Sequence, residues 1–371
     1  MKKKVFLFLA LALLVVGGAF AQRVGETYTL AGQNYTVVSV NGDDVTLRKV
    51  AAQTGDGPVN WTAVANSPFG TTTVNAVAYG NNTWVAVGDR GQVAYSADNG
   101  RTWTLVPILD SRGNNTTTPF YDVAFGNGRW IAVGNNMDAT STDNGRTWTP
   151  IDGIPTNPES AIAFANGRWI SAAVAGRTAY STDGTTWTAV TAADIFGGSN
   201  SDFIRGLAFG NNRWVAGSRG PIGYSADGAR WTAAGDSAFG TGSGGAIWGI
   251  AFGNNRFVAV GANGKIAYSA DGAAWTAVPP GSMRDAGQTT FYNGVIQGVA
   301  FGNNRFVAVG GDGRIAYSTD GTRWTAVENR TAWQYTNARS QTVQAAPTAV
   351  AYGNGRFVAV GTEGKIAYCD W

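Results

Sequence analysis

Apolar and polar residues alternate along most of this chain in short segments, and the pattern recurs with a period of roughly 40–50 residues. The copy that starts at Ile250 contains four such segments, at residues 250–252, 256–260, 265–268 and 275–278. Between them lie stretches rich in glycine and asparagine, the residues that tolerate the positive φ of tight hairpin turns. The pattern therefore predicts four short β-strands in each copy, which we label A to D in chain order.

The repeat occurs seven times, and each copy opens on an apolar residue that we call the anchor. The anchors are Val77, Val123, Ile162, Leu207, Ile250, Val299 and Val350. Seven repeats of four antiparallel strands predict an all-β fold, a seven-bladed β-propeller, with A strands beside the axis and D strands outermost.

The seventh copy has no D strand, because the sequence reaches Trp371 directly after its C segment. A segment of the right kind, residues 59–64, stands before the first copy and carries Trp61 where a D strand carries its tryptophan. We predict that this segment completes the last blade, which closes the ring and removes an open sheet edge.

The residues before the propeller (59–371) fall into three parts. Residues 1–21 combine a basic start, a short apolar run and small residues before Gln22, which is typical of a secretory signal peptide. We therefore expect an exported protein, periplasmic, cell-surface or secreted, with no membrane span after cleavage. Residues 22–50 alternate like a small three-stranded β-meander, and residues 51–58 are interpreted as a linker.

A common motif, Ser-x-Asp-x-Gly-x-Thr-Trp or a form one residue shorter, joins strands C and D in the six complete copies. The aspartate can accept backbone N–H groups within the turn, the glycine can take a left-handed conformation, and the tryptophan can pack inward. We interpret the six aspartates as structural: Asp98, Asp143, Asp183, Asp227, Asp271 and Asp320.

The same motif makes residues 59–371 resemble the Asp-box, or BNR-repeat, propellers. That superfamily includes sialidases and other glycoside hydrolases, sortilin-type receptors and the photosystem II assembly propellers. The resemblance to sialidases implies six blades and an Arg-Ile-Pro motif, and this chain has neither. Its seven copies are more similar to the assembly-factor branch, and this resemblance implies protein binding rather than catalysis.

Composition narrows the chemistry further. The chain contains no histidine, which excludes Ser-His-Asp and Cys-His catalysis and His-ligated zinc. Its single cysteine, Cys369, excludes an intramolecular disulfide. The net charge of +3 comes from the lysines of residues 1–21, so the mature chain is neutral and lacks the basic surface expected of a nucleic-acid binder. We expect no metal and no cofactor.

Length variation between copies is concentrated in the connections from strand D to the next strand A. From the D-strand tryptophan to the next anchor, the spacing runs from 14 to 26 residues, whereas it is 18 or 19 from anchor to motif serine. Variable loops on one face of a rigid scaffold predict a binding face there, opposite the Asp-box turns. Its candidate ligand-binding aromatics are Phe291, Tyr292, Trp333 and Tyr335, although such residues can also fill gaps between blades.

A second candidate set lies two residues before each anchor, near the mouth of the axial channel. No two of these residues are alike, although the anchors beside them are nearly identical: Asn75, Tyr121, Ser160, Arg205, Trp248, Gln297 and Thr348. Our hypothesis is that this mixed polar and aromatic ring, above all Asn75, Tyr121, Arg205, Trp248 and Gln297, contacts a ligand. Unconstrained drift would produce the same appearance.

The sequence thus favours a non-catalytic, monomeric binding or assembly scaffold for a protein partner or a cell-envelope glycan. One alternative is a sialidase-like glycoside hydrolase with paired carboxylates at the channel mouth. Its candidate acids are Asp110, Asp122, Glu159, Asp194, Asp202, Asp236, Asp285 and Glu328. Another alternative is a subunit of a surface layer or filament. A further repeated residue, the arginine that begins most B strands, is interpreted as structural.

Overall fold

The computed structural model describes the backbone of residues 27–30, 33–41 and 44–49, and then residues 59–110, 112–151, 153–156, 159–200, 202–235, 238–240, 242–279 and 294–371. The chain divides into two compact units, Met1–Pro58 and Val59–Trp371. The expected signal peptide and linker lie outside the described residues. Within the described part of the chain, no helix is long and apolar enough to cross a membrane.

The first unit contains the small meander that the sequence predicts. Its strands β1 (Thr27–Leu30), β2 (Gln33–Asn41) and β3 (Asp44–Lys49) form one antiparallel sheet in the order β1-β2-β3.

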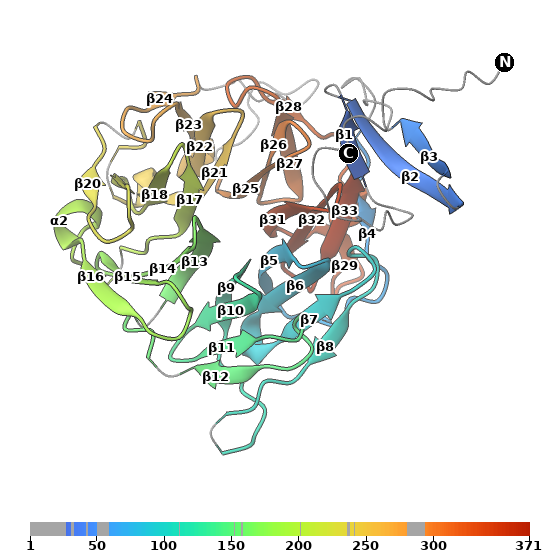
Figure 1. Ribbon diagram of the computed structural model, residues 1–371, viewed down its shortest axis with the longest axis horizontal. Helices are drawn as coiled ribbons and strands as arrows, with labels where there is room; N and C mark the ends of the chain where they lie inside the picture. Colours follow the sequence, from blue (N-terminus) through green and yellow to red (C-terminus); the bar gives the residue numbers. More distant parts are fainter. Residues whose placement is uncertain are drawn as a thin grey trace. The chain divides into compact units, whose positions relative to one another are not determined.

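The second unit is a seven-bladed β-propeller, as predicted, with four antiparallel strands in each blade (Figure 1). Blade 1 is built from β5 (Val74–Gly80), β6 (Thr83–Gly88), β7 (Val93–Ser96) and β8 (Thr104–Val106). Blade 2 is built from β9 (Phe120–Gly126), β10 (Arg129–Gly134), β11 (Asp138–Ser141) and β12 (Thr149–Ile151). Blade 3 is built from β13 (Glu159–Ala165), β14 (Arg168–Ala173), β15 (Arg177–Ser181) and β16 (Thr188–Thr191). Blades 4 and 5 are built from β17 (Gly206–Gly210), β18 (Arg213–Gly217), β19 (Ile222–Ser225) and β20 (Thr232–Ala233); and β21 (Ile247–Gly253), β22 (Arg256–Gly261), β23 (Ile266–Ser269) and β24 (Thr276–Ala277).

Blades 6 and 7 are built from β25 (Ile296–Gly302), β26 (Arg305–Gly310), β27 (Arg314–Ser318) and β28 (Thr325–Ala326); and β31 (Pro347–Gly353), β32 (Arg356–Gly361), β33 (Ile366–Asp370) and β4 (Thr62–Ala63). The connections hold short elements only: α2 (Ala193–Phe196), the 3-10 turns η1 (Asp89–Gly91), η2 (Ser243–Gly245), η3 (Ala262–Gly264) and η4 (Thr331–Trp333), and the hairpin of β29 (Gln334–Thr336) and β30 (Thr342–Gln344).

Blade 7 closes the ring in the predicted way. Its outer strand β4 precedes the whole first blade in sequence and pairs antiparallel with β33, with Thr62 opposite Tyr368. The backbone N–H of Val64 adds a hydrogen bond of 2.8 Å to the carbonyl oxygen of Ile366. Trp61, only 5% exposed, packs into the core of this blade, so the closing segment contributes apolar burial as well as backbone pairing.

The blades pack through aromatic rings and glycines at the ends of the A strands. In blade 2 the ring of Phe125 lies 5.0 Å from that of Trp130, which is fully buried. Gly126, the last residue of β9, lies against Phe164 of blade 3, where a Cβ would approach a ring carbon to 2.0 Å. The repeated aromatic-glycine pair is thus explained by close approach of neighbouring blades.

The Asp-box turns hold themselves together by local hydrogen bonds. In the first turn Oδ1 of Asp98 accepts the Ser96 hydroxyl at 2.8 Å and the backbone N–H groups of Arg101 and Thr102 at 3.0 and 2.9 Å. The indole of Trp103 donates to the carbonyl oxygen of Gly100. The carboxylate is therefore engaged within its own turn, on the face opposite the D-to-A connections.

The arginines that begin the B strands join neighbouring blades. Arg213 of blade 4 packs its guanidinium over Tyr224, with 4.5 Å from Cζ to the ring centroid. It also donates a 2.6 Å hydrogen bond to the carbonyl oxygen of Asp271, the Asp-box residue of blade 5. These contacts support the interpretation of the B-strand arginines as structural, because Arg213 binds a C-strand tyrosine and a backbone carbonyl group.

Candidate functional site

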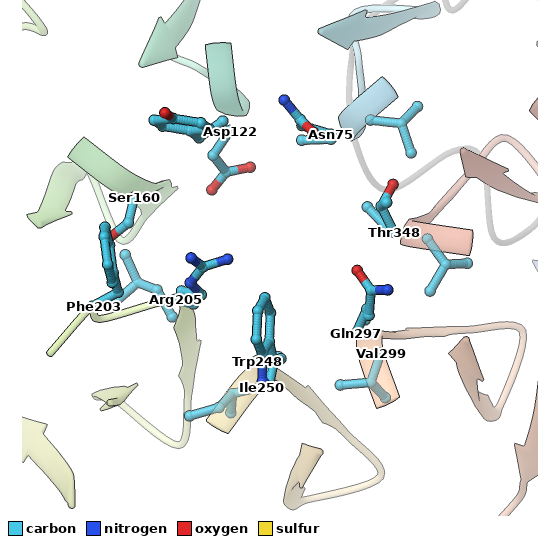
Figure 2. Close-up of a pocket in the computed structure, with 18 residues that line it drawn as sticks. Asn75, Asp122, Ser160, Phe203, Arg205, Trp248, Ile250, Gln297, Val299 and Thr348 are labelled. Atoms are coloured by element: carbon cyan, nitrogen blue, oxygen red, sulfur yellow. The ribbon is translucent and has the colours of Figure 1, made fainter. Parts of the chain in front are cut away.

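The seven residues that precede the anchors by two positions line one cavity at the mouth of the axial channel (Figure 2). The cavity has a volume of about 400 Å³, within the range of small-ligand sites. Anchors form its apolar floor, among them Val77, Leu207, Ile250, Val299 and Val350. The sequence hypothesis thus grouped residues that the fold brings together from all seven blades.

A repeated β-bulge explains why these side chains stand at the mouth. In blade 5 Ile247 pairs with Gly261 and Gly249 pairs with Val260, which leaves Trp248 without a partner in the ladder. The same irregularity falls on Asn75, Tyr121, Ser160, Gln297 and Thr348 in their blades. In blade 4 the ladder stops at Gly206, one residue after Arg205. A bulge redirects a side chain out of the regular alternation, and here it does so around a ring.

Three members of the ring are tied to backbone carbonyls of the next blade. Asn75 donates to the carbonyl oxygen of Phe120 at 2.9 Å, and Ser160 donates to that of Ile204 at 2.7 Å. Thr348 donates to the carbonyl oxygen of Val74 at 2.5 Å. Short polar side chains at these seams therefore serve blade-to-blade cohesion, and Asn75, a predicted ligand contact, belongs to this group.

Arg205, Trp248 and Gln297, from the consecutive blades 4 to 6, have side chains without a hydrogen bond to any described residue. The guanidinium of Arg205 packs over two rings, with Cζ 4.2 Å from the centroid of Trp248 and 4.9 Å from that of Phe203. Surrounding groups displace enough water to lower the pKa of Arg205, while Tyr121 acts in the opposite direction. In this arc Arg205 and Gln297 offer polar groups to a ligand, whereas Trp248 offers its ring, because its indole N–H is buried.

Asp122 adds a carboxylate between the bulge residue of blade 2 and the anchor. Its Oδ1 accepts the backbone N–H of Val123 and its Oδ2 accepts that of Ile162 in blade 3, both at 2.8 Å. Burial raises the pKa of Asp122 to about 7, against these two hydrogen bonds, which lower it. Asp122 therefore joins blade 2 to blade 3, and the described contacts include no ion pair between Asp122 and Arg205.

A second cavity of about 240 Å³ adjoins the first at the seam between blades 4 and 5. Both cavities are lined by Phe203, Arg205 and Trp248, so the arginine and its two rings form the boundary between them. Arg219 and Ser218 stand on the outer side.

The loop aromatics have different positions. Trp333 is fully buried, and Tyr335 is half-buried on the same cluster as Trp61, so both pack between blades instead of lining a cavity. Phe291 and Tyr292 lie outside the described residues. The contacts of Trp333 and Tyr335 therefore agree with the alternative that loop aromatics fill gaps between blades.

The described lining of the first cavity contains one carboxylate, that of Asp122. Asp110, another candidate acid, accepts the backbone N–H groups of Asn114 and Arg112 within its own exposed loop. The side chains of Glu159, Asp236 and Asp285 lie outside the described part. Among the described residues, no cluster of carboxylate, histidine or cysteine side chains could hold a metal ion.

Neither a protein-family model nor a curated protein matches this chain. Among solved structures it is similar to YCF48 from Cyanidioschyzon merolae, with a TM-score of 0.61 and 19% identity over 83% of this chain and 98% of that one. YCF48 bound to D1 peptide matches with a TM-score of 0.61 and 18% identity, over 85% and 98% of the two chains. At such low identity the similarity shows the fold alone.

An enzyme with this fold also matches. The catalytically inactive histidine-to-alanine variant of virginiamycin B lyase from Staphylococcus aureus, bound to quinupristin, has a TM-score of 0.61 and 12% identity, over 84% of this chain and 99% of that one. The present chain contains no histidine at any position, so it has no residue equivalent to the one replaced there.

Sequence reasoning considered Asp122 only as a hydrolase acid and missed its position in the ring. A signal was present: the residue directly before the anchor is alanine or glycine in the other six copies (Ala76, Ala161, Gly206, Gly249, Gly298 and Ala349). Phe203 carried no comparable signal, because only the contact with Arg205 distinguishes it from other loop aromatics.

Proposed function

We propose that this chain is a non-catalytic binding module that holds a peptide segment of a protein partner at the mouth of its axial channel. The observation that carries the proposal is the arc of Arg205, Trp248 and Gln297, which lines the cavity with the ring of Trp248 and with polar groups of Arg205 and Gln297 that have no described partners. Polar groups that a rigid scaffold leaves unpaired in a cavity gain most from a ligand that supplies their hydrogen bonds.

Two further observations support binding over glycoside hydrolysis. The described lining supplies a single carboxylate, whereas hydrolysis by paired carboxylates, the alternative drawn from the sequence, needs two. Asp122 also has both oxygens engaged by backbone N–H groups. A solved structure of YCF48, a similar propeller, has D1 peptide bound, so a peptide ligand is compatible with this fold.

Peptide and glycan arrays probed with the full chain test the proposal. We expect peptide binding that Trp248→Ala weakens by about 2 kcal/mol, since a half-buried tryptophan at the centre of a site is a frequent hot spot. Gln297→Ala should weaken it less. Arg101→Ala, an exposed change on the Asp-box face, should leave it unchanged. Binding to glycans alone, or peptide binding insensitive to both cavity variants, would overturn the proposal.

We also propose that the protein is exported and belongs with the Asp-box propellers. Residues 1–21 support export, and the hydrogen-bonded Ser-Asp-Gly turns support the grouping. N-terminal sequencing of the protein recovered from a bacterial host tests export: a mature chain starting at Gln22 is expected, and retention of Met1 would contradict it.

A further inference from the structure

The strongest unexplained feature is the environment of Arg205. Its guanidinium packs against Trp248 and Phe203 and has no ion pair or side-chain hydrogen bond with the described residues. Contacts with two ring faces engage the plane of a guanidinium and leave its N–H groups at the edges, where they can form two parallel hydrogen bonds with a planar anion. We propose that Arg205 binds a carboxylate of an extended peptide lying across the seam between blades 4 and 5.

The charges of the two cavities support an anionic ligand. Arg205 and Arg219 are the cationic residues among the described lining, and Asp122 is the one acidic residue. Asp122 accepts two backbone N–H groups and forms no described ion pair with Arg205. A ligand group with negative charge therefore finds a complementary site on the arginine side of the channel mouth.

The shape of the site favours an extended ligand. The cavities of about 400 and 240 Å³ meet at Phe203, Arg205 and Trp248, so together they lead from the channel axis outward across one seam. The apolar floor, with Leu207 and Ile250, suits the uncharged part of a ligand whose anion lies on Arg205. An extended chain can occupy both cavities at once, whereas an isolated ion would fill neither.

The aromatic rings favour a peptide over a sugar. Recognition of a sugar usually requires an aromatic face open to the pyranose ring. Here the guanidinium covers faces of both Trp248 and Phe203. The rings thus position the arginine, and we treat Phe203 and Trp248 as positioning residues for it.

The inference rests on the proposed function, and four probes distinguish a failure of the inference from a failure of the proposed function. They are a capped alanine pentapeptide with a central glutamate, the same peptide with glutamine, the glutamine peptide with a free C-terminal carboxylate, and sodium glucuronate. Each is titrated into the ¹⁵N-labelled full chain, and binding is measured from the indole N–H signal of Trp248, assigned with Trp248→Phe.

We expect the glutamate peptide to bind about tenfold more tightly than the glutamine peptide, the difference typical of a charge-assisted hydrogen bond. Tight binding of the peptide with a free terminus would place the carboxylate at a chain end, and weak binding would place it on a side chain. The preference should vanish in Arg205→Met, which keeps the apolar stem on both rings but removes the charge. It should be reduced in Arg205→Lys, which keeps the charge but loses the planar fork.

Arg112→Met is the matched control, since it makes the same change in an exposed loop residue outside both cavities. The preference should persist there, and circular dichroism should show that all variants are folded. Equal binding of all three peptides, or a preference for a carboxylate that survives in Arg205→Met, would overturn the inference and leave the proposed function intact. Binding of glucuronate alone would overturn both, and binding of no probe would overturn the inference.

Discussion

Asp122 shows how a single residue can depart from a repeat. At the equivalent position the other six blades have alanine or glycine, and only blade 2 places a carboxylate against the channel. Its two carboxylate oxygens accept the backbone N–H groups of Val123 in blade 2 and Ile162 in blade 3, so a carboxylate side chain joins the two blades. Burial opposes that charge, so ionisation of the carboxyl group costs stability, although the two hydrogen bonds favour the ionised form.

The first prediction concerns the pH dependence of this residue. Because its folded-state pKa of about 7 exceeds the ordinary value of 3.8, ionisation of Asp122 costs stability that grows as pH rises from about 4 to 7. Asp122→Ala removes that cost, so the melting temperature of the variant should rise relative to wild type between pH 4 and pH 8.

The control is built into the comparison, since the Asp-box carboxylates titrate alike in both proteins and cancel in the difference. A difference in melting temperature that stays constant from pH 4 to pH 8 would show that Asp122 titrates normally.

Among the elements, the Asp-box turn joins local hydrogen bonding to contact between blades. The glycine of each turn lies on the B strand of the preceding blade: Gly228, at φ +72°, faces Ile170, and Gly145, at φ +76°, faces Val85. The carboxylate holds the turn, the glycine allows close approach, and the following tryptophan covers the blade edge. One short motif therefore sets both the hairpin and its fit to the neighbour.

The second prediction concerns the carboxylate of such a turn. Burial alone would raise the pKa of Asp143, but hydrogen bonds from Thr147, Ser141 and Arg146 lower it to about 2. Its stabilising effect is present above the ordinary value of 3.8 and is lost as pH falls toward 2. Asp143→Asn should therefore melt below wild type at pH 5, and the two should converge near pH 2.5. A gap that does not narrow with acidification would contradict this prediction.

The third prediction separates backbone strain from packing. Gly355→Ala places a side chain at φ +76° with no atom within 4 Å, so it should cost about 1 kcal/mol. Gly228→Ala adds an overlap, because its Cβ would lie 2.1 Å from Cδ1 of the buried Ile170. We expect about 1–3 kcal/mol more in urea unfolding. Equal costs would mean that the blades can separate locally without penalty.

At the scale of the whole molecule, ring closure depends on a strand of two residues and on one tryptophan. Both β4 and Trp61 come from upstream of the first blade, and both pack on the C-terminal sheet. Closure of this kind covers the outer edge of β33 in blade 7 and links the two ends of the propeller sequence.

The fourth prediction compares two shortened chains, one beginning at Val59 and one at Ser67, which differ in the closing segment alone. Loss of the buried Trp61 and the β4 ladder should lower the melting temperature of the shorter chain by about 5 °C or more relative to the longer one. The longer chain is the control for removal of the first unit. Identical melting curves would show that β4 contributes nothing to closure.

Sequence alone was sufficient for the propeller because its signals are local and repeated. Asn254 and Asn255 occupy the left-handed conformation that the turn from A to B needs, and the Ser-Asp-Gly turns mark every complete C-to-D connection. The site was only partly predictable. The repeat predicts that Trp248 and Gln297 both lie at the mouth of the axial channel. The bulge that redirects their side chains, however, depends on the register between two strands in each blade.

The division of the ring into tied and available residues could not be read from residue type. Asn75 and Gln297 carry the same amide group, yet Asn75 reaches Asp89 and the Phe120 carbonyl while Gln297 reaches no described partner. Likewise Trp248 lines a cavity and Trp333 is buried between blades. These differences depend on the distances between side chains of one blade and atoms of the next. Such distances are known only once the blades are placed in the folded structure.

The pairing of β4 with β33 has a consequence for how the protein is made. On the ribosome β4 emerges before any complete blade, whereas its partner β33 (Ile366–Asp370) emerges after all the other described strands of the propeller. Until β33 is available, a nascent chain can pack its earlier blades together, but β4 has no partner strand and the ring stays open. Loss of β33 should therefore be as damaging as loss of β4, and only a chain translated through Asp370 reaches the closed state.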